Sequence, residues 1–223
     1  MRTHEAARLK EPVAPKLPPK LARAAYPEDE PADDSVHLSL HYGAFDLVGL
    51  DVEAVEFERC RFDETRLAGT TFRRTGLADV AFKGCDLANL RMFDSRMFGV
   101  AIEDCRLTGL SLTDCGFRDV LFRDCRADLT SFRFSRFKNV VFRGCNLAEA
   151  NFQGADLRGA RFEDCRLTGA QFSAAHMHGT RIANCDLYGV NGIQSFEGAI
   201  VNTTDAQGLL HALTAAMGIT IED

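Results

Sequence analysis

A single periodicity dominates this sequence of 223 residues. From Leu47 to Leu187 every fifth residue is a large apolar side chain, and Ala127 is the only exception. A period of five fits neither the roughly 3.6-residue turn of an amphipathic helix nor the two-residue alternation of a half-buried strand. The chain is therefore built from internal repeats, and this repeat decides its fold.

Two further positions repeat together with the apolar one. Two residues before it lies a column of mostly Ala, Cys, Ser, Thr or Val, which contains all eight cysteines. Two residues after it, Gly, Asn or Asp occupies 20 of the 25 sites from Gly69 to Gly189, and these residues tolerate the backbone angles of tight turns. One large and one small inward side chain, followed by a bend, predict a coil that leaves three outward residues in every five.

Several segments match a known repeat unit. Residues 145–149, 150–154 and 155–159 resemble the A-(D/N)-L-x-x unit of pentapeptide-repeat proteins, and the resemblance covers about residues 45–190. It implies an all-β fold, the right-handed quadrilateral β-helix of a pentapeptide-repeat solenoid. Four repeats would form one coil, and residues 20 apart would stack one strand spacing, about 4.8 Å, above each other.

A 20-residue coil can be tested within the sequence, because side chains of one type should recur at multiples of 20. One such column contains the phenylalanines Phe62, Phe82, Phe122, Phe142 and Phe162. Another contains the cysteines Cys85, Cys105, Cys125, Cys145, Cys165 and Cys185. Parallel side chains one strand spacing apart exceed the Cβ separation that a disulfide prefers. We therefore predict reduced thiols packed as small hydrophobes, as expected in a reducing cytoplasm.

Composition and phase divide the chain into three parts. Residues 1–35 contain all six prolines and a basic stretch followed by an acidic one, which predicts a flexible Pro-rich arm. Residues 36–191 form the predicted β-helix. The phase breaks at Gly192, so residues 192–223 are expected to form a C-terminal cap and dimerisation helix.

The predicted cap is a short helix over about residues 205–217. Thr204 or Asp205 could cap its start, and Gly218 could close its end. An open coil end exposes apolar side chains and unpaired strand edges, so we expect this helix to cover the last coil.

No residue set in the sequence indicates catalysis. The sequence contains no Walker loop, no Rossmann glycine pattern and no Ser or Cys in a nucleophile setting. His176 and His178 flank the inward Met177, and a metal-binding pair there is the minor alternative. We therefore expect no enzyme, no cofactor and no metal site. No apolar run of membrane length and no signal peptide is present, which favours a cytoplasmic protein without a membrane partner.

The outer surface offers the candidate binding residues. On the face of the phenylalanine column, acidic residues recur as a discontinuous strip, for which ordinary solvated charge is the alternative. The candidate partner-binding residues are Asp63, Glu64, Glu103, Asp104, Asp124, Glu163 and Asp164. The candidate apolar contacts are the outward residues Phe93, Phe98 and Phe134, for which imperfect repeats are the alternative.

The tail resembles a narrower group. Residues 198–202, the following helix and residues 217–219 are similar to the C-terminal cap of the Qnr and MfpA type fluoroquinolone-resistance proteins. The resemblance implies a homodimer formed through the cap. It also implies a non-enzymatic rod that imitates duplex DNA when it binds DNA gyrase or topoisomerase IV. The expected dimer interface consists of Leu209, Leu210, Leu213 and Met217.

The balance of basic and acidic residues in the repeat region leaves a second function open. Residues 66–190 hold 18 basic and 14 acidic groups, although the whole chain carries a net charge of −6. A general protein-interaction scaffold with no role at gyrase is therefore the alternative. Direct binding of nucleic acid is not expected, because no interleaved aromatic platform accompanies the basic residues.

Overall fold

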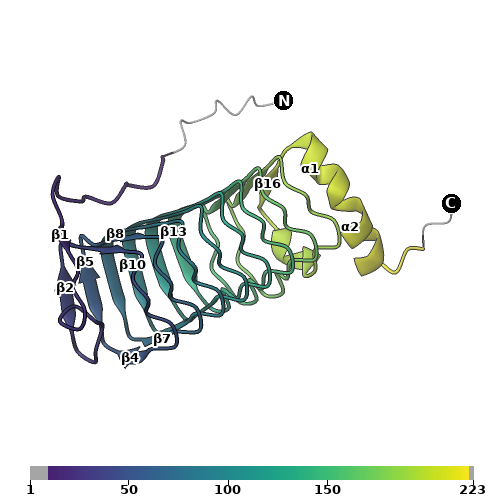
Figure 1. Cartoon of the computed structure of the whole chain (residues 1–223). Coiled ribbons are helices and arrows are strands. Elements are labelled where there is room, and N and C mark those ends of the chain that lie inside the picture. Colours follow the sequence, from purple (N-terminus) through teal and green to yellow (C-terminus); the bar gives the residue numbers. More distant parts are fainter. Residues whose placement is uncertain (1–9, 221–223) are drawn as a thin grey trace.

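The computed structural model describes residues 10–220, so residues 1–9 of the predicted arm and residues 221–223 of the predicted cap lie outside it. The chain forms a rod of stacked coils whose strands run parallel from one coil to the next (Figure 1). Strand pairs from β2 to β15 join residues 20 apart, as in Val36 with Glu56 and Glu163 with Ala183. Four pentapeptides therefore complete one coil, and the predicted parallel β-solenoid is confirmed.

The strands form two sheets that follow the rod. The four-stranded sheet contains β4 (Asp51–Glu53), β7 (Thr71–Arg73), β9 (Arg91–Phe93) and β11 (Ser111–Thr113). The twelve-stranded sheet contains β1 (Ala22–Arg23), β2 (Val36–Leu38), β3 (Leu40–Gly43), β5 (Glu56–Glu58), β6 (Arg61–Asp63), β8 (Gly76–Lys83), β10 (Arg96–Glu103), β12 (Gly116–Arg123), β13 (Arg136–Arg143), β14 (Arg161–Glu163), β15 (Arg181–Ala183) and β16 (Ile200–Val201).

The bend residues adopt the backbone conformation that their type predicts. Asp124 has φ 53° and Gly144, one coil later in the same column, has φ 64°. Residues with a β-carbon are strained at positive φ, and Asp and Asn tolerate this region better than most. This steric preference explains why Gly, Asn and Asp dominate the third repeating position.

The interior consists of the two inward columns. Phe142 stacks on Phe122 with ring centroids 4.7 Å apart and on Phe162 at 5.0 Å, and the rings are nearly parallel. All eight cysteines are free and buried, as predicted. Burial raises the pKa of the Cys115 thiol to about 12, so this side chain is a neutral thiol at ordinary pH.

The register changes at the C-terminal end of the rod. After Gly192 and the short 3-10 helix η1 (Ile193–Phe196), β16 pairs Ile200 with Arg181, which is 19 residues away. Gly192 has φ 77°, and a β-carbon there would lie 2.4 Å from the backbone nitrogen of Ser173. Glycine is therefore required where the repeat ends.

The expected C-terminal capping helix is present, and it is divided into two short helices. They are α1 (Thr203–Gly208) and α2 (Leu210–Ala216), separated by the buried Leu209. Gly218, at φ 71°, closes α2 as predicted, and the Ile219 amide donates to the Thr214 carbonyl over 2.9 Å. Neither helix, nor any other within residues 10–220, has the length and apolar character needed to span a bilayer.

The predicted start of the cap helix was wrong by two residues or more. The N-cap is Asn202, whose Oδ1 accepts a hydrogen bond from the Asp205 amide at 2.7 Å. Asp205 is buried, and its own Oδ1 accepts from the Cys185 amide at 3.0 Å. The Asp205 side chain therefore accepts a hydrogen bond from the last coil, and Asn202 satisfies one of the free N–H groups at the start of the helix.

The N-terminal end of the rod is also covered. Strand β1 pairs with β3, and residues 24–35 pack over the first coil. The fully buried Tyr42 donates a hydrogen bond to the Asp29 carbonyl at 3.0 Å, and its hydroxyl also lies 2.8 Å from His37 Nδ1. Residues assigned by sequence to a flexible arm thus contribute a second cap, while the boundary at residue 35 stays a prediction.

Candidate binding face

The candidate face is formed by β6, β8, β10, β12, β13 and β14 and by the bends that follow them. It displays two neighbouring outward columns. The first, which we call the charge ladder, consists of Asp63, Lys83, Glu103, Arg123, Arg143 and Glu163. The second, which we call the acidic edge, consists of the bend residues Glu64, Asp104, Asp124 and Asp164.

The charge ladder is largely neutralised within the chain. Glu103 pairs with Arg123 at 2.8 Å, and Glu163 pairs with Arg143 at 2.7 Å. At the other end, Asp63 accepts from Arg61 at 2.6 Å. Burial opposes ionisation of Asp63, but the hydrogen bond and charge of Arg61 lower the pKa of this carboxyl below its ordinary 3.8. Three of the seven predicted strip residues therefore have cationic partners inside the protein.

The acidic edge has a different environment. All four of its carboxylates are exposed, and none of them forms an ion pair within residues 10–220. Each has a φ between 53° and 55°. The edge spans five coil spacings, or about 24 Å. Duplex DNA carries about 14 charges over that length, so the edge is several-fold sparser than a DNA backbone.

The three predicted apolar contacts do not form one patch. Phe98 lies on β10 and is 44% exposed, and the Arg118 guanidinium lies over its ring at 5.5 Å. Phe134 is a bend residue at φ 60°, and it is 47% exposed beneath Arg133. Phe93 lies on β9 of the other sheet and is half-buried. Cation–π contacts with arginine occupy two of these rings.

The predicted dimer residues divide into two groups. Leu209 is buried at the end of the rod, so its side chain belongs to the monomer core. Leu210, Leu213 and Met217 are 58%, 45% and 73% exposed. Only these three are available to a second chain.

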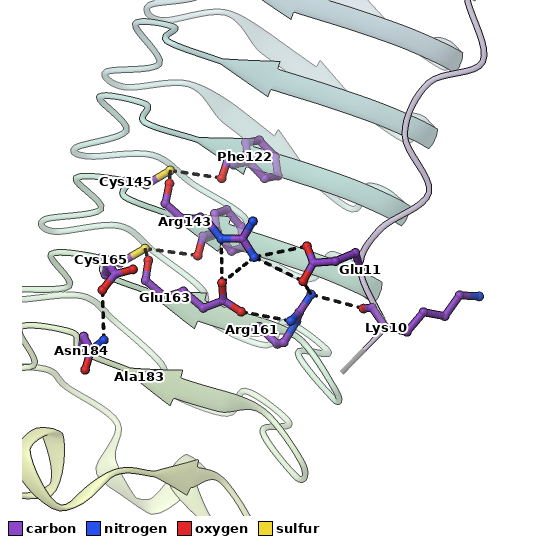
Figure 2. Close-up of polar contacts among 12 residues, drawn as sticks. Lys10, Glu11, Phe122, Arg143, Cys145, Arg161, Glu163, Cys165, Ala183 and Asn184 are labelled. Atoms are coloured by element: carbon purple, nitrogen blue, oxygen red, sulfur yellow. Dashed lines mark hydrogen bonds and ion pairs between the residues drawn. The ribbon is translucent and has the colours of Figure 1, made fainter. Parts of the chain in front are cut away.

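Sequence reasoning missed one part of the face, because it comes from outside the repeat. The Glu11 carboxylate lies 3.2 Å from Arg143 and 2.9 Å from Arg161 (Figure 2). Arg161 is only 6% exposed, although it occupies an outward position. The basic residues of the face were visible in the sequence, but an arm without a period gives no signal of which ones it contacts.

The chemistry that the face presents is charge. Within the described part of the chain, no three His, Cys, Asp or Glu side chains gather where they could share a metal ion. What the face offers is a set of charges held at fixed spacings on a rigid support.

The match to a family model agrees with the observed repeat. The family model for the pentapeptide repeat region matches residues 55–132 and 127–191. No curated protein matches the sequence. Among solved structures, a trypsin-treated variant of QnrB1, a plasmid-mediated fluoroquinolone resistance protein, is 23% identical, covers 85% of this chain and 92% of its own, and has a TM-score of 0.38.

Two further structures are similar to the chain. Full-length QnrB1 is 20% identical over 80% of this chain and 99% of its own, with a TM-score of 0.31. HetL, a pentapeptide repeat protein involved in heterocyst differentiation regulation in the cyanobacterium Nostoc, is 16% identical over 77% of this chain and 89% of its own, with a TM-score of 0.32.

Proposed function

Since the chain belongs to the pentapeptide-repeat family, we propose that it is a non-enzymatic binding rod for a type II topoisomerase, DNA gyrase or topoisomerase IV. The observation that carries the proposal is the acidic edge, whose four exposed carboxylates have no cationic partner within residues 10–220. A basic protein groove that normally holds DNA phosphates has the complementary charge. The sequence resemblance of the cap favours gyrase among proteins with such a groove.

The charge density of the edge sets how strongly it can bind. An exposed ion pair contributes about 0.2–1 kcal/mol, so four carboxylates supply about 1–4 kcal/mol at low salt. This is too little for tight binding alone, because association itself costs at least about 4 kcal/mol. We infer that the edge sets orientation and speeds association, and that duplex mimicry is partial. A dimer, which displays two edges, would increase the effect by avidity.

The proposed dimer uses the exposed side of the cap. Leu210, Leu213 and Met217 form an apolar surface that nothing covers within residues 10–220, and a two-fold partner would bury it. Replacing Leu213→Glu is expected to give monomers, which light scattering would detect. Leu209→Glu is unsuitable for this test, since it would disrupt the monomer core. A native chain that is monomeric at micromolar concentration would contradict the dimer.

A supercoiling assay tests the proposed partner. The purified chain is titrated into DNA gyrase with and without a fluoroquinolone, at low and at physiological salt. We expect it to inhibit supercoiling or to protect the enzyme from the drug, more strongly at low salt. Unchanged supercoiling under all these conditions would rule out gyrase as the partner.

The second candidate is a scaffold for a partner other than a topoisomerase. The observation that favours it is the charge ladder, because a column that contains both signs of charge fits a mixed-charge protein surface better than a uniformly basic DNA groove. With either partner we propose a cytoplasmic location, which eight free cysteines support.

A further inference from the structure

The arm lies extended along the candidate face. From β1 it runs back along the side of the rod, so that residues 10–17 cross several coils (Figure 1). The Lys16 amide donates to Asp79 Oδ1 at 3.0 Å, and the Val13 amide donates to Asp119 Oδ1 at 3.4 Å. The rod therefore recognises the backbone of the arm through carboxylates at its bends.

The spacing of these contacts follows from two regular structures. Asp79 and Asp119 are two coils apart, or about 9.6 Å. Three residues of a polyproline II helix span about 9.3 Å, so the amides of Val13 and Lys16 match this separation. Pro12 and Pro15 directly precede these two donors and favour the extended conformation. Because proline has no N–H group, the rod needs no acceptor at these two positions. A PxxP segment in this conformation thus fits the period of the coils.

An acidic side chain fixes the direction of the segment. The Glu11 carboxylate binds both Arg143 and Arg161, and Arg161 also donates to the Lys10 carbonyl at 3.2 Å (Figure 2). Arg161 is almost fully buried, whereas the Glu11 side chain is 56% exposed. Within the rod Arg161 is also held by Glu163 at 3.1 Å, whereas the Glu11 carboxylate of the arm is open to solvent. Because the Glu11 carboxylate is open to solvent, water weakens these pairs, and the arm can be displaced.

The arm does not fill the groove that it occupies. A cavity of about 330 Å³ lies between residues 12–17 of the arm and the outward side chains of Ala81, Ala101 and Leu121. The arm lines this cavity with Pro12, Val13, Ala14, Pro15 and Leu17, among which Ala14 has the smallest side chain. A segment with a larger apolar residue at the position of Ala14 would bury more apolar surface in the same groove.

We propose that this groove is a docking site for an extended segment of a partner protein, with an acidic residue, two prolines three residues apart and a large apolar residue between them. Residues 10–17 occupy the groove in the free chain, and the partner segment replaces them. The proposal is independent of the topoisomerase proposal, because the residues that bind the arm, Asp79, Asp119, Arg143 and Arg161, do not belong to the acidic edge.

Peptide binding to the full chain tests the docking site. The probe is a dye-labelled peptide with the sequence of residues 10–20, measured by fluorescence anisotropy. Because the tethered arm competes at an effective concentration in the millimolar range, the native chain should bind the probe weakly. Glu11→Ala in the full chain weakens the arm and should tighten probe binding about fivefold or more. A probe carrying Ala14→Leu should bind this variant more tightly than the native probe does.

Two groove variants complete the experiment. Asp79→Gly with Asp119→Gly removes the acceptors, and Gly99, in the same bend column, shows that glycine suits the backbone there. In the Glu11→Ala background this pair should weaken probe binding about fivefold or more, while circular dichroism stays unchanged. Probe affinity that responds neither to Glu11→Ala nor to the glycine pair would overturn the proposal, as would equal affinity of the two probes.

Discussion

The charge ladder and the acidic edge run side by side on one face, one residue apart in sequence, and have opposite electrostatic environments. In the ladder each carboxylate stacks next to a base one coil away, as Glu103 does on Arg123, so charge cancels. In the edge the neighbours one coil away are Gly84, Gly144 and Asn184 or another carboxylate, so charge remains. On a solenoid, the residue 20 positions away therefore decides whether a surface carboxylate is neutralised within the chain or stays available to a partner.

The largest expected difference between the two columns concerns stability. Arg161 lies outside the ladder but holds its carboxylate Glu163. Arg161→Ala removes this buried guanidinium and its bonds to Glu163 and Glu11, and it should lower the free energy of unfolding by about 1–3 kcal/mol. Asp164→Asn changes the adjacent edge and should stay within about 0.5 kcal/mol of the native value. Urea unfolding followed by circular dichroism measures both. Equal losses would contradict the distinction between ladder and edge.

A smaller difference should appear at acid pH. The pKa of Asp63 is lowered in the folded chain, so its stabilising contribution is present above its ordinary pKa of 3.8 and is lost as the pH falls through the folded value. The thermal midpoint of the native chain should therefore fall more steeply below about pH 4 than that of the Asp63→Asn variant. Glu64→Gln, one residue further on, is the matched edge control. If Asp63→Asn leaves the acid profile unchanged, the proposed role of Asp63 is wrong.

The smallest expected effect separates two roles of an edge residue, its negative charge and its tolerance of the backbone angles of the bend. Asp124→Asn removes the charge and keeps a residue that tolerates a φ of 53°, so stability should change little. Asp124→Ala removes the same charge and should cost about 0.5–1 kcal/mol more, because alanine is strained at positive φ. Thermal unfolding of the two variants separates turn geometry from charge. Identical midpoints would mean that the bend imposes no requirement on side-chain type.

The sequence predicted the features that the five-residue repeat determines, chiefly which side chains face the core. The period placed Phe122 and Cys115 inside, because two residues in every five, one large and one small, face the core. The cancellation of Glu103 by Arg123 was present in the sequence too, but it becomes visible only when charges are compared across coils instead of along the chain. The start of the cap was misplaced because Asn202, Thr204 and Asp205 are all good N-cap residues, and tertiary contacts decide among them.

The contact between Glu11 and Arg161 lay beyond sequence reasoning for a different reason. Its two residues are 150 positions apart, and the arm has no period that could be aligned with the coils. Its prolines and charges suggested a segment unable to form a core of its own. A segment that forms no core of its own can still bind to the surface of the rod, as the arm does.

The central claim is that the acidic edge, and not the charge ladder, binds the partner. The direct test is a gyrase supercoiling titration with the variant Glu64→Gln, Asp104→Asn, Asp124→Asn and Asp164→Asn. Its matched control carries Asp94→Asn and Asp114→Asn, two bend residues of another column. We predict that the edge variant loses about tenfold or more in potency at low salt while the control keeps the native potency. Equal potency of the edge variant and the native chain would contradict the claim.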